Sequence, residues 1–274
     1  MRIYIGTSGY SYKDWIGPVY PKGMKPEEML RFYSTLFPYS ELNFSYYRMP
    51  EPAMLESMAR KTPESFRFGI KGHQDLTHNA DRAEWEAAAR RFLEGIAPLS
   101  ESGKLAMVLL QFPFSFHYTP DNRLYLSALM DSLSSVPLCA EFRNREWQNE
   151  RVCGELEERR IGYVMTDSPP LAGLALPTVL ATGPFGYLRL HGRNSGSWWT
   201  GDAVSRYDYL YSEEELSEWI PRILSLHGRT AVLYIAFNNH HKGQAVKNGM
   251  QMKNLLVAQP DLEIDLTVLR TPIM

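Results

Sequence analysis

Apolar and polar side chains alternate along eight short runs of this chain. In one of them, Tyr187, Arg189 and His191 alternate with two leucines. Alternate residues of a strand point to opposite faces of a sheet, so one face of this run is aliphatic and the other carries polar groups. The runs 137–142 and 231–238 alternate in the same way. The pattern predicts strands with one face in an apolar core and the other lined by reactive side chains.

Segments with helical spacing of apolar residues separate these runs. The strand-like runs lie near 2–6, 40–44, 66–71, 105–111, 137–142, 162–167, 186–191 and 231–238. The helical segments lie at 51–61, 82–96, 121–134, 147–160 and 243–258, with a further one opened by Pro26. Strands that alternate with helices predict an α/β fold, and eight such units predict a single TIM-type (β/α)8 barrel.

Two units depart from the regular alternation. Ser212 and Glu215 have the spacing of a capping box and open a helix, which Pro221 should kink or delay. After the sixth strand, prolines and Gly173 interrupt any helical periodicity between residues 168 and 177. The unit after strand six is therefore predicted to be irregular.

The length of the chain fits one domain. A barrel of this type takes about 250 residues. The chain has 274, so residues 1–274 are predicted to form a single TIM-barrel domain. Residues from about 261 to 274, with a β-like segment at 266–269, are predicted to be a terminal extension. Hydrophobic residues make up 44% of the chain, which is ample material for a core.

Composition narrows the setting in which the protein works. The formal net charge of -2 excludes a strongly basic surface overall, although a local basic patch can still attract phosphates. Cys139 and Cys153 are too few for a disulfide scaffold or a cysteine-rich zinc site. The sequence contains no signal-like segment and no run of ~18 apolar residues, so we expect a cytoplasmic protein that does not associate with membranes.

Polar residues gather where the predicted strands end. Barrels of this type carry their chemistry at the C-terminal ends of the strands. The polar side chains expected to meet there are Ser8, Glu41, Asn43, Arg67, Lys71, Gln111, Glu141, Arg143, Asp167, Arg189, His191 and Asn238. Buried charges are costly unless they are paired, so Glu41, Glu141 and Arg189 should form ion pairs. The same set could also be a purely structural polar plug.

Cations outnumber carboxylates in this set. Lys71, Arg143 and Arg189, joined by Arg193 and Lys247 from loops, predict that the mouth binds an anionic group. Asn238, Asn239 and Gln111 are expected to orient the ligand by hydrogen bonds. The turn Gly6-Thr7-Ser8-Gly9 could add backbone amides to such a site.

Aromatic residues follow several of the predicted strands. They are Tyr10, Tyr12, Trp15, Tyr46, Tyr47, Trp147, Trp198 and Trp199. Aromatic faces beside cations suit stacking with sugars or unpaired bases. Trp198 is accordingly included among the expected ligand-binding residues.

His191 and Glu141 are the expected catalytic pair. An unperturbed histidine pKa of about 6.5 suits proton transfer near neutrality. No cofactor is predicted, and no metal ligands are assigned. A divalent metal would have to use His240 and His241 with nearby acids, but adjacent histidines rarely ligate one ion and the neighbouring cations would repel it.

Several of these residues lie in motifs that resemble a known family. The motifs are Gly6-Thr7-Ser8-Gly9-Tyr10, Asp14-Trp15, Thr77-His78, Gln111-Phe112-Pro113, Glu141-Phe142-Arg143 with Trp147, Arg189-Leu190-His191-Gly192-Arg193, and Phe237-Asn238-Asn239 with Gly243, Ala245 and Asn248. As an ordered set over nearly the whole chain they resemble the YecE-like domain-of-unknown-function 72 family. The resemblance implies a TIM-type barrel with a cleft at the C-terminal ends of its strands, and it implies no reaction. The chain departs from the family pattern at His240-His241, where an acidic residue is expected, and at Gly249, where alanine is usual.

Three functional hypotheses remain open from the sequence. The favoured one is an enzyme that binds an anionic, phosphorylated or nucleotide-like substrate at the barrel mouth and uses His191 and Glu141 for acid-base chemistry. The second is a non-catalytic protein that binds single-stranded nucleic acid or a phosphometabolite. The third, a metal-dependent hydrolase or isomerase, depends on analogy between barrels. The sequence specifies neither the substrate nor the oligomeric state.

Overall fold

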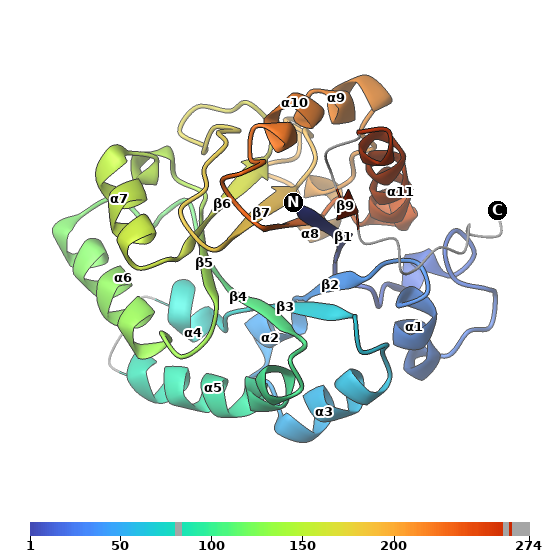
Figure 1. Cartoon of the computed structure of the whole chain (residues 1–274), viewed down its shortest axis with the longest axis horizontal. Coiled ribbons are helices and arrows are strands. Elements are labelled where there is room, and N and C mark those ends of the chain that lie inside the picture. The colour runs from blue at the N-terminus through green and yellow to red at the C-terminus, as the bar shows by residue number, and fades with distance from the viewer. Residues whose placement is uncertain (80–83, 260–262, 265–274) are drawn as a thin grey trace.

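Eight parallel strands form a closed barrel with helices around its outside (Figure 1). The computed structural model describes residues 1–79, 84–259 and 263–264. The barrel strands are β1 (Arg2–Ser8), β2 (Tyr39–Leu42), β3 (Arg67–Lys71), β4 (Leu105–Phe112), β5 (Leu138–Phe142), β6 (Gly162–Asp167), β7 (Phe185–Leu190) and β8 (Val232–Phe237). Neighbours in the chain are neighbours in the sheet, and β1 lies between β8 and β2, which closes the ring. The predicted (β/α)8 barrel is confirmed.

Helices follow most of the strands. The longer ones are α1 (Pro26–Tyr33), α3 (Pro52–Arg60), α5 (Trp85–Glu101), α6 (Pro120–Ser132), α7 (Glu150–Glu158) and α11 (Gln244–Val257). The short ones are η1 (Lys13–Trp15), α2 (Phe44–Tyr47), α4 (Gln74–Thr77), η2 (Arg145–Trp147), α8 (Ala203–Arg206), α9 (Glu213–Ser217), α10 (Trp219–Leu224) and η3 (His241–Gly243). Helix α5 continues past the predicted end at 96 because Leu99 extends its buried stripe. Residues 82–83, where this helix was predicted to begin, lie outside the described residues.

The irregular units occur where the sequence predicts them. The Ser212 hydroxyl accepts a hydrogen bond from the Glu215 amide at 3.2 Å, and the Glu215 carboxylate accepts one from the Ser212 amide at 2.9 Å, so the capping box forms. Pro221 lies in α10, which begins directly after α9 ends, so one predicted helix is two short ones. Residues 168–184 contain no helix.

Tyrosines fill the barrel below its polar mouth. The Tyr4 and Tyr234 rings stack with their centroids 5.1 Å apart, and the Tyr39 ring lies 5.0 Å from that of Tyr234. The Tyr39 hydroxyl also donates a hydrogen bond to that of Tyr187 at 3.0 Å. A Cβ on Gly69 would lie 2.4 Å from the Tyr39 hydroxyl, so only glycine leaves room for this ring. The alternate strand residues that the sequence predicted to point inward, such as Tyr187 and Tyr234, thus line the barrel interior.

The first and last barrel strands meet at a seam that loops reinforce. Strands β1 and β8 pair from Arg2↔Val232 to Thr7↔Phe237. Above them, the Trp15 indole donates to the His240 carbonyl at 2.7 Å, and the Lys242 amide donates to the Asp14 carboxylate at 2.6 Å. Helices η1 and η3, which carry these groups, are thereby joined across the seam.

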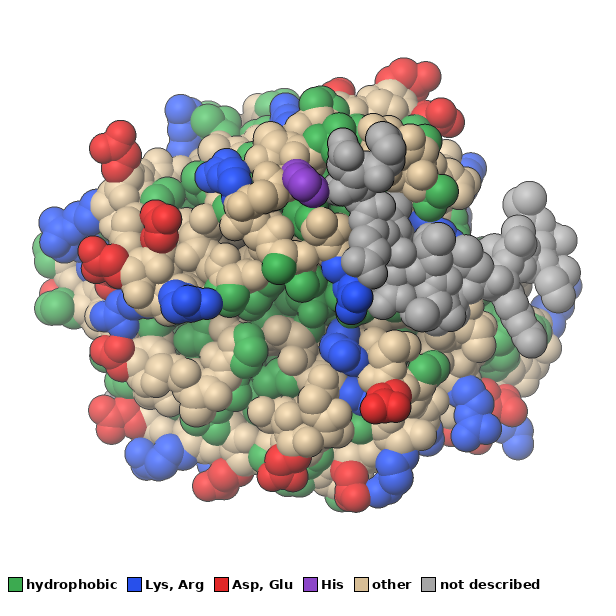
Figure 2. Space-filling model, viewed as in Figure 1, with side chains coloured by type: hydrophobic (Ala, Val, Ile, Leu, Met, Phe, Trp, Pro, Cys, Tyr) green, Lys and Arg blue, Asp and Glu red, His purple; other side chains and the backbone are tan. Residues whose placement is uncertain are grey.

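The opposite end of the barrel has a hollow of its own. This hollow has a volume of about 800 Å³, and arginine side chains lie in its wall (Figure 2). Arg67, which the parity argument placed at the mouth, lines this opposite end because it is the first residue of β3. Strand β9 (Glu263–Ile264) pairs with the start of β1. The β-like segment predicted at 266–269 lies outside the described residues.

None of the helices in the described ranges combines the length and apolar character needed to cross a membrane.

Candidate functional site

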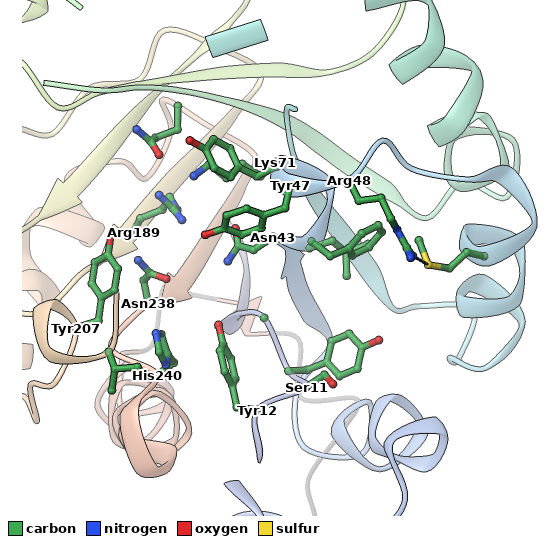
Figure 3. Close-up of a pocket in the computed structure, with 18 of the residues that line it drawn as sticks. Ser11, Tyr12, Asn43, Tyr47, Arg48, Lys71, Arg189, Tyr207, Asn238 and His240 are labelled. Atoms are coloured by element: carbon green, nitrogen blue, oxygen red, sulfur yellow. Dashed lines mark hydrogen bonds between the residues drawn. The ribbon is translucent and has the colours of Figure 1, made fainter. Parts of the chain in front are cut away.

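A pocket of about 660 Å³ opens at the C-terminal ends of the strands (Figure 3). Predicted site residues in its wall are Asn43, Lys71, Gln111, Arg143, Arg189 and Asn238. Aromatic and imidazole rings complete it, from Tyr10, Tyr12, Tyr46, Tyr47, Tyr207 and His240. A smaller hollow of about 350 Å³ shares Tyr46, Gln111, Arg143 and Tyr207 with this pocket and is lined by Trp198 and Trp199. We call the larger one the mouth pocket and the smaller one the side hollow.

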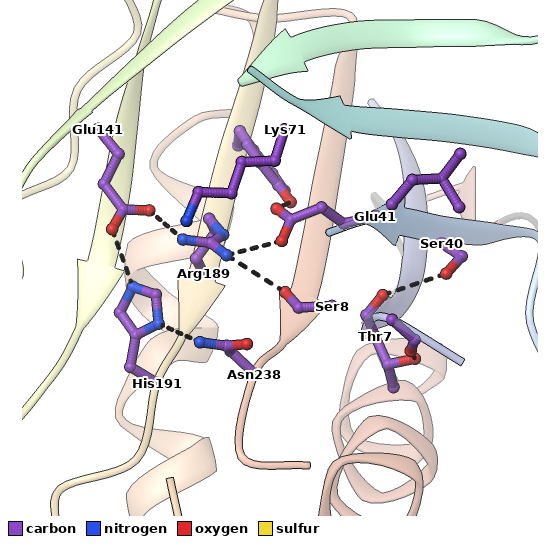
Figure 4. A network of polar contacts seen from close by, with 12 residues as sticks. Thr7, Ser8, Ser40, Glu41, Lys71, Glu141, Arg189, His191 and Asn238 are labelled. Atoms are coloured by element: carbon purple, nitrogen blue, oxygen red, sulfur yellow. Dashed lines mark hydrogen bonds and ion pairs between the residues drawn. The ribbon is translucent and has the colours of Figure 1, made fainter. Parts of the chain in front are cut away.

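Arg189 holds two buried carboxylates at the floor of the mouth pocket (Figure 4). Its guanidinium donates to Glu41 at 2.6 Å and, with its other amino group, to Glu141. The Ser8 hydroxyl lies 3.5 Å from the same guanidinium, and the Tyr187 hydroxyl donates to Glu41. Strands β1, β2, β5 and β7 thus contribute side chains to one network of charge-assisted hydrogen bonds. The ion pairs predicted from the sequence are present.

His191 lies behind the pocket wall and is fully buried. The Asn238 amide nitrogen, which can only donate, is 3.1 Å from His191 Nδ1, so Nδ1 accepts and Nε2 carries the proton. That Nε2 lies 3.3 Å from Glu141 Oε1, which is also 2.6 Å from Arg143 Nε. His191 lines neither the mouth pocket nor the side hollow.

The protonation states of this pair are fixed by their surroundings. Burial, aided by Arg143, lowers the pKa of His191 to about 3, so the ring is neutral. Burial alone would raise the pKa of Glu141, but Arg189 and Arg143 hold that pKa well below its usual range. A neutral histidine and an ionised, doubly paired glutamate suit positioning of neighbouring groups better than proton exchange near pH 7.

Two cations of the pocket wall lack a carboxylate partner among the described residues: Arg48, whose guanidinium donates to the Met54 sulfur at 3.2 Å, and Lys71. The Lys71 ammonium lies 4.2 Å from the centre of the Tyr46 ring, and it makes no hydrogen bond or ion pair with any described residue. Burial, with Arg189 next, lowers the pKa of Lys71 to about 7. The amine is therefore present in both protonation states at neutral pH.

The pocket wall is electropositive. Around it, Arg143 and Arg189 are balanced by Glu41 and Glu141, so Arg48 and a protonated Lys71 add uncompensated charge. His78, in the side hollow, responds to the same field: burial and then Lys71 and Arg143 lower its pKa to about 4. The arrangement favours an anion in the pocket.

Two predicted site residues, Asp167 and Arg193, lie away from both the mouth pocket and the side hollow. Asp167 accepts hydrogen bonds from the Tyr211 hydroxyl and the Trp219 indole, both at 2.8 Å, and pairs with Arg193 at 2.8 Å. Arg193 also forms an ion pair with Glu218, so its positive charge is balanced by carboxylates on the outer side of the barrel. Asp167 lies on the same face of β6 as Tyr163 and Met165, which pack against the outer helices, so its side chain points away from the barrel interior.

Asn239 and Lys247 also differ from their predicted places. The Asn239 amide donates to the Tyr209 carbonyl and to Asn248 Oδ1, both at 2.8 Å, so it fixes loops and does not reach the pocket. Lys247 lies exposed on α11. Consecutive residues after a strand point to opposite sides, which separates Asn239 from Asn238.

The tryptophans of the predicted rim divide into two groups. Trp15 and Trp147 are fully buried, and the Trp147 ring stacks on Phe142 with centroids 4.7 Å apart. Trp198 is buried beside the site, with the Arg143 guanidinium 5.4 Å from its ring, whereas Trp199 is 52% exposed. Only Trp198 and Trp199 thus border the candidate site.

The predicted turn at Gly6–Gly9 is not a turn, because Gly6 to Ser8 belong to β1, and the segment does not offer all its amides to a ligand. The Thr7 amide donates to the Tyr33 hydroxyl at 2.9 Å, and the Gly9 amide donates to the Glu41 carbonyl at 2.8 Å. The segment therefore joins β1 to its neighbours, and the proposed amide cradle is not formed by these two groups.

Sequence reasoning missed Arg48 and gave Tyr207 no role. Arg48, beside Met54 in the pocket wall, follows the four-residue helix α2, and Tyr207 follows α8 in the long segment after β7. Turns this short carry no periodicity, so the tyrosine-rich composition of 207–211 was the one available signal for Tyr207.

The two departures from the family pattern have local explanations. The His240 ring stacks on Tyr12 with centroids 4.5 Å apart and forms part of the pocket wall. A Cβ on Gly249 would lie 3.0 Å from the Phe37 ring, which explains the glycine. In the described ranges, no three His, Cys, Asp or Glu side chains are grouped as a metal site requires.

Comparison with known proteins gives consistent matches over almost the full length. A family model described as "Protein of unknown function DUF72" matches residues 4–268. The UPF0759 protein YunF of Bacillus subtilis (strain 168) is 32% identical over 269 residues, which cover 93% of this chain and 94% of that protein.

Solved structures show the same architecture. A DUF72 family protein from Thermotoga maritima MSB8 is 38% identical with a TM-score of 0.86, and the match covers 94% of this chain and 100% of that one. A DUF72 family protein from Enterococcus faecalis V583 is 26% identical with a TM-score of 0.81, over 94% of this chain and 96% of that one.

Proposed function

The chain belongs to the DUF72 family of proteins of unknown function, as its motifs predicted, and we propose that it binds a small anionic substrate in the mouth pocket. The observation that carries this proposal is the uncompensated ammonium of Lys71. Arg143 and Arg189 are paired with carboxylates, and Arg48 adds a second cation to the wall, whose guanidinium contacts the Met54 sulfur. A carboxylate or phosphate would complete the charge balance.

The neighbouring groups supply orientation. The amides of Asn43, Gln111 and Asn238 line the same pocket and can hydrogen-bond to hydroxyl or carbonyl oxygens. Glu41 and Glu141 hold Arg189 in place beneath them. In this proposal His191 and Glu141 are positioning residues. The acid-base role that the sequence predicted for these two residues is assigned instead to side chains that line the mouth pocket.

A thermal-shift titration with sulfate at constant ionic strength tests the proposal. At an anion concentration of 100 Kd, binding adds about 2.7 kcal/mol to stability. A protein of this size gains about 2–4 °C in Tm per kcal/mol, so Tm should rise by about 5–10 °C. The K71M variant should lose this response, and the matched variant K247M, on the exposed face of α11, should keep it. Equal responses in both variants would refute the role of Lys71.

Single-stranded nucleic acid is a second candidate ligand, favoured by one observation. Tyr47 and Trp199 are 71% and 52% exposed, and they line the mouth pocket and the side hollow respectively. Exposed aromatic faces beside a basic pocket are typical of surfaces that stack unpaired bases. The dependence of binding on salt concentration distinguishes the two ligands.

A further inference from the structure

We propose that Lys71 forms an imine with the carbonyl carbon of an anionic aldehyde or keto acid bound in the mouth pocket. The inference rests on the proposed anion site and names the substrate class. It assigns a covalent role to a side chain at the end of β3 whose nitrogen reaches into the pocket (Figure 3).

The surroundings of Lys71 differ from those of a structural lysine. Lys71 is half-buried, whereas Lys104 is buried and its ammonium donates to the carbonyls of Ala59 and Thr62 at 2.6 and 2.8 Å and to the Thr62 hydroxyl at 3.1 Å. The Lys71 nitrogen has no such acceptor among the described residues and lies against the Tyr46 ring. An amine kept from acceptors at a pocket wall is available to a ligand.

The charge environment favours the reactive form of this amine. Burial and the nearby Arg189 lower the pKa of Lys71 to about 7, so much of it is the free amine at neutral pH. Exposed lysines, with a pKa of about 10.4, are almost entirely protonated there. Lysines made nucleophilic by desolvation or by a neighbouring cation are an established route to imines with carbonyl substrates.

The substrate's anionic group has a place beside the amine. Arg48 lines the same pocket without a carboxylate partner among the described residues, and its guanidinium can donate to a carboxylate or phosphate. The imine is cationic when protonated, so it preserves the charge that the anion balances. The amides of Asn43 and Gln111 line the pocket and can donate to the carbonyl oxygen before it leaves.

The step balances without an oxidant or reductant. The Lys71 nitrogen forms a bond to the carbonyl carbon while the C=O π pair moves to oxygen, which takes up a proton to give a carbinolamine. The hydroxyl then leaves as water while the C=N bond forms. The two hydrogens lost from the amine and the carbonyl oxygen account for the water.

Reductive trapping tests the inference on the unmodified protein. The protein is incubated with glyoxylate and cyanoborohydride near pH 7, and carboxymethylated lysines are located by peptide mass spectrometry. Lys71 should be modified at least about tenfold faster than the exposed Lys247, since its pKa of about 7 leaves much of it as the free amine. Its labelling rate should level off above pH about 7.

Controls separate this inference from the anion site on which it rests. Acetaldehyde, which lacks the anionic group, should lose the preference for Lys71, and excess sulfate should suppress labelling by glyoxylate. K71R keeps the charge, so it should still respond to sulfate in the thermal-shift titration. If sulfate stabilises the protein but Lys71 is labelled no faster than Lys247, the imine proposal is wrong and the anion site stands. If Lys71 is labelled selectively without any sulfate response, the anion site is wrong.

Discussion

At the scale of single residues, Arg189 is the centre of the ion-pair network at the floor of the mouth pocket. Its guanidinium holds Glu41 and Glu141, which come from different strands and have no exposed surface. Buried ion pairs contribute little net stability, but removing one partner leaves the other charge buried and unpaired. The network is therefore sensitive to loss of any one member.

Replacing Glu141 by glutamine should destabilise the fold by about 3–5 kcal/mol, because Arg189 and Arg143 then lose a shared carboxylate. Urea unfolding followed by tryptophan fluorescence measures this change. The control E94Q alters an exposed position on α5 and should change stability by less than about 0.5 kcal/mol. Similar stabilities for the two variants would show that the network is not stabilising.

Lys71 should make stability depend on pH in a defined direction. Its pKa is about 7 in the folded protein and 10.5 in the reference state, so the folded state binds fewer protons between these values. The wild-type protein should therefore gain stability as pH rises through this window. K71M removes the buried charge, so its advantage over wild type should be largest at or below pH about 7 and shrink toward pH about 10. A stability difference that does not vary with pH would contradict the lowered pKa.

Residue positions were predictable where alternation is unambiguous. Arg189 and His191 alternate with leucines, so their common face could be read from the sequence. In 162–167 both parities are largely apolar, and Asp167 was therefore assigned to the wrong face. The pKa of His191 was also unpredictable, because it depends on burial and on Arg143, which is distant in sequence.

At the scale of elements, close strand contact sets the shape of the barrel. Strand β1 pairs with β2 at Gly6↔Tyr39, and a Cβ on Gly6 would lie 2.0 Å from the Tyr39 carbonyl oxygen. Only glycine permits this approach, which closes the ring at the first strand.

Substitution G6A should therefore destabilise the protein by about 3 kcal/mol, at the upper end of overpacking effects. Its matched control is G154A in helix α7, where an added Cβ meets nothing within 4 Å. That change should stabilise the protein by about 0.5–1 kcal/mol because alanine is the better helix former. Thermal and urea unfolding compare the two, and a shift of the same sign in both would contradict the close approach.

The longer helices and all eight strands were predictable because their periodicity extends over several turns or alternations. Helices α2 and α4 were not, since four residues complete only about one turn. These short elements place Tyr46 and His78 around the mouth. The part of the site carried by barrel strands was thus predicted better than the part carried by the following turns.

At the scale of the whole molecule, a local positive pocket lies in a protein with a formal net charge of -2. Such a balance favours small anions over long polyanions, since attraction is confined to the mouth. Among the described residues, the cations of this pocket without a carboxylate partner are Arg48 and Lys71.

Anion binding should therefore weaken only modestly with salt. For sulfate we expect a slope of about -1 in log K against log salt, whereas single-stranded DNA that engages four phosphates should give about -3. Fluorescence titrations of both ligands over a range of sodium chloride concentrations measure these slopes. Tight DNA binding with the steeper slope, unaffected by K71M, would favour the nucleic-acid hypothesis instead.

The seam between β1 and β8 determines when the pocket can exist during protein synthesis. Translation supplies Lys71 and the three arginines of the pocket wall before Asn238 and His240, which form the last part of that wall. Strand β1 cannot pair with β8, and Trp15 cannot donate to the His240 carbonyl, until those residues have been synthesised. In a nascent chain, the wall of the mouth pocket is therefore complete only after the residues up to His240 have left the ribosome.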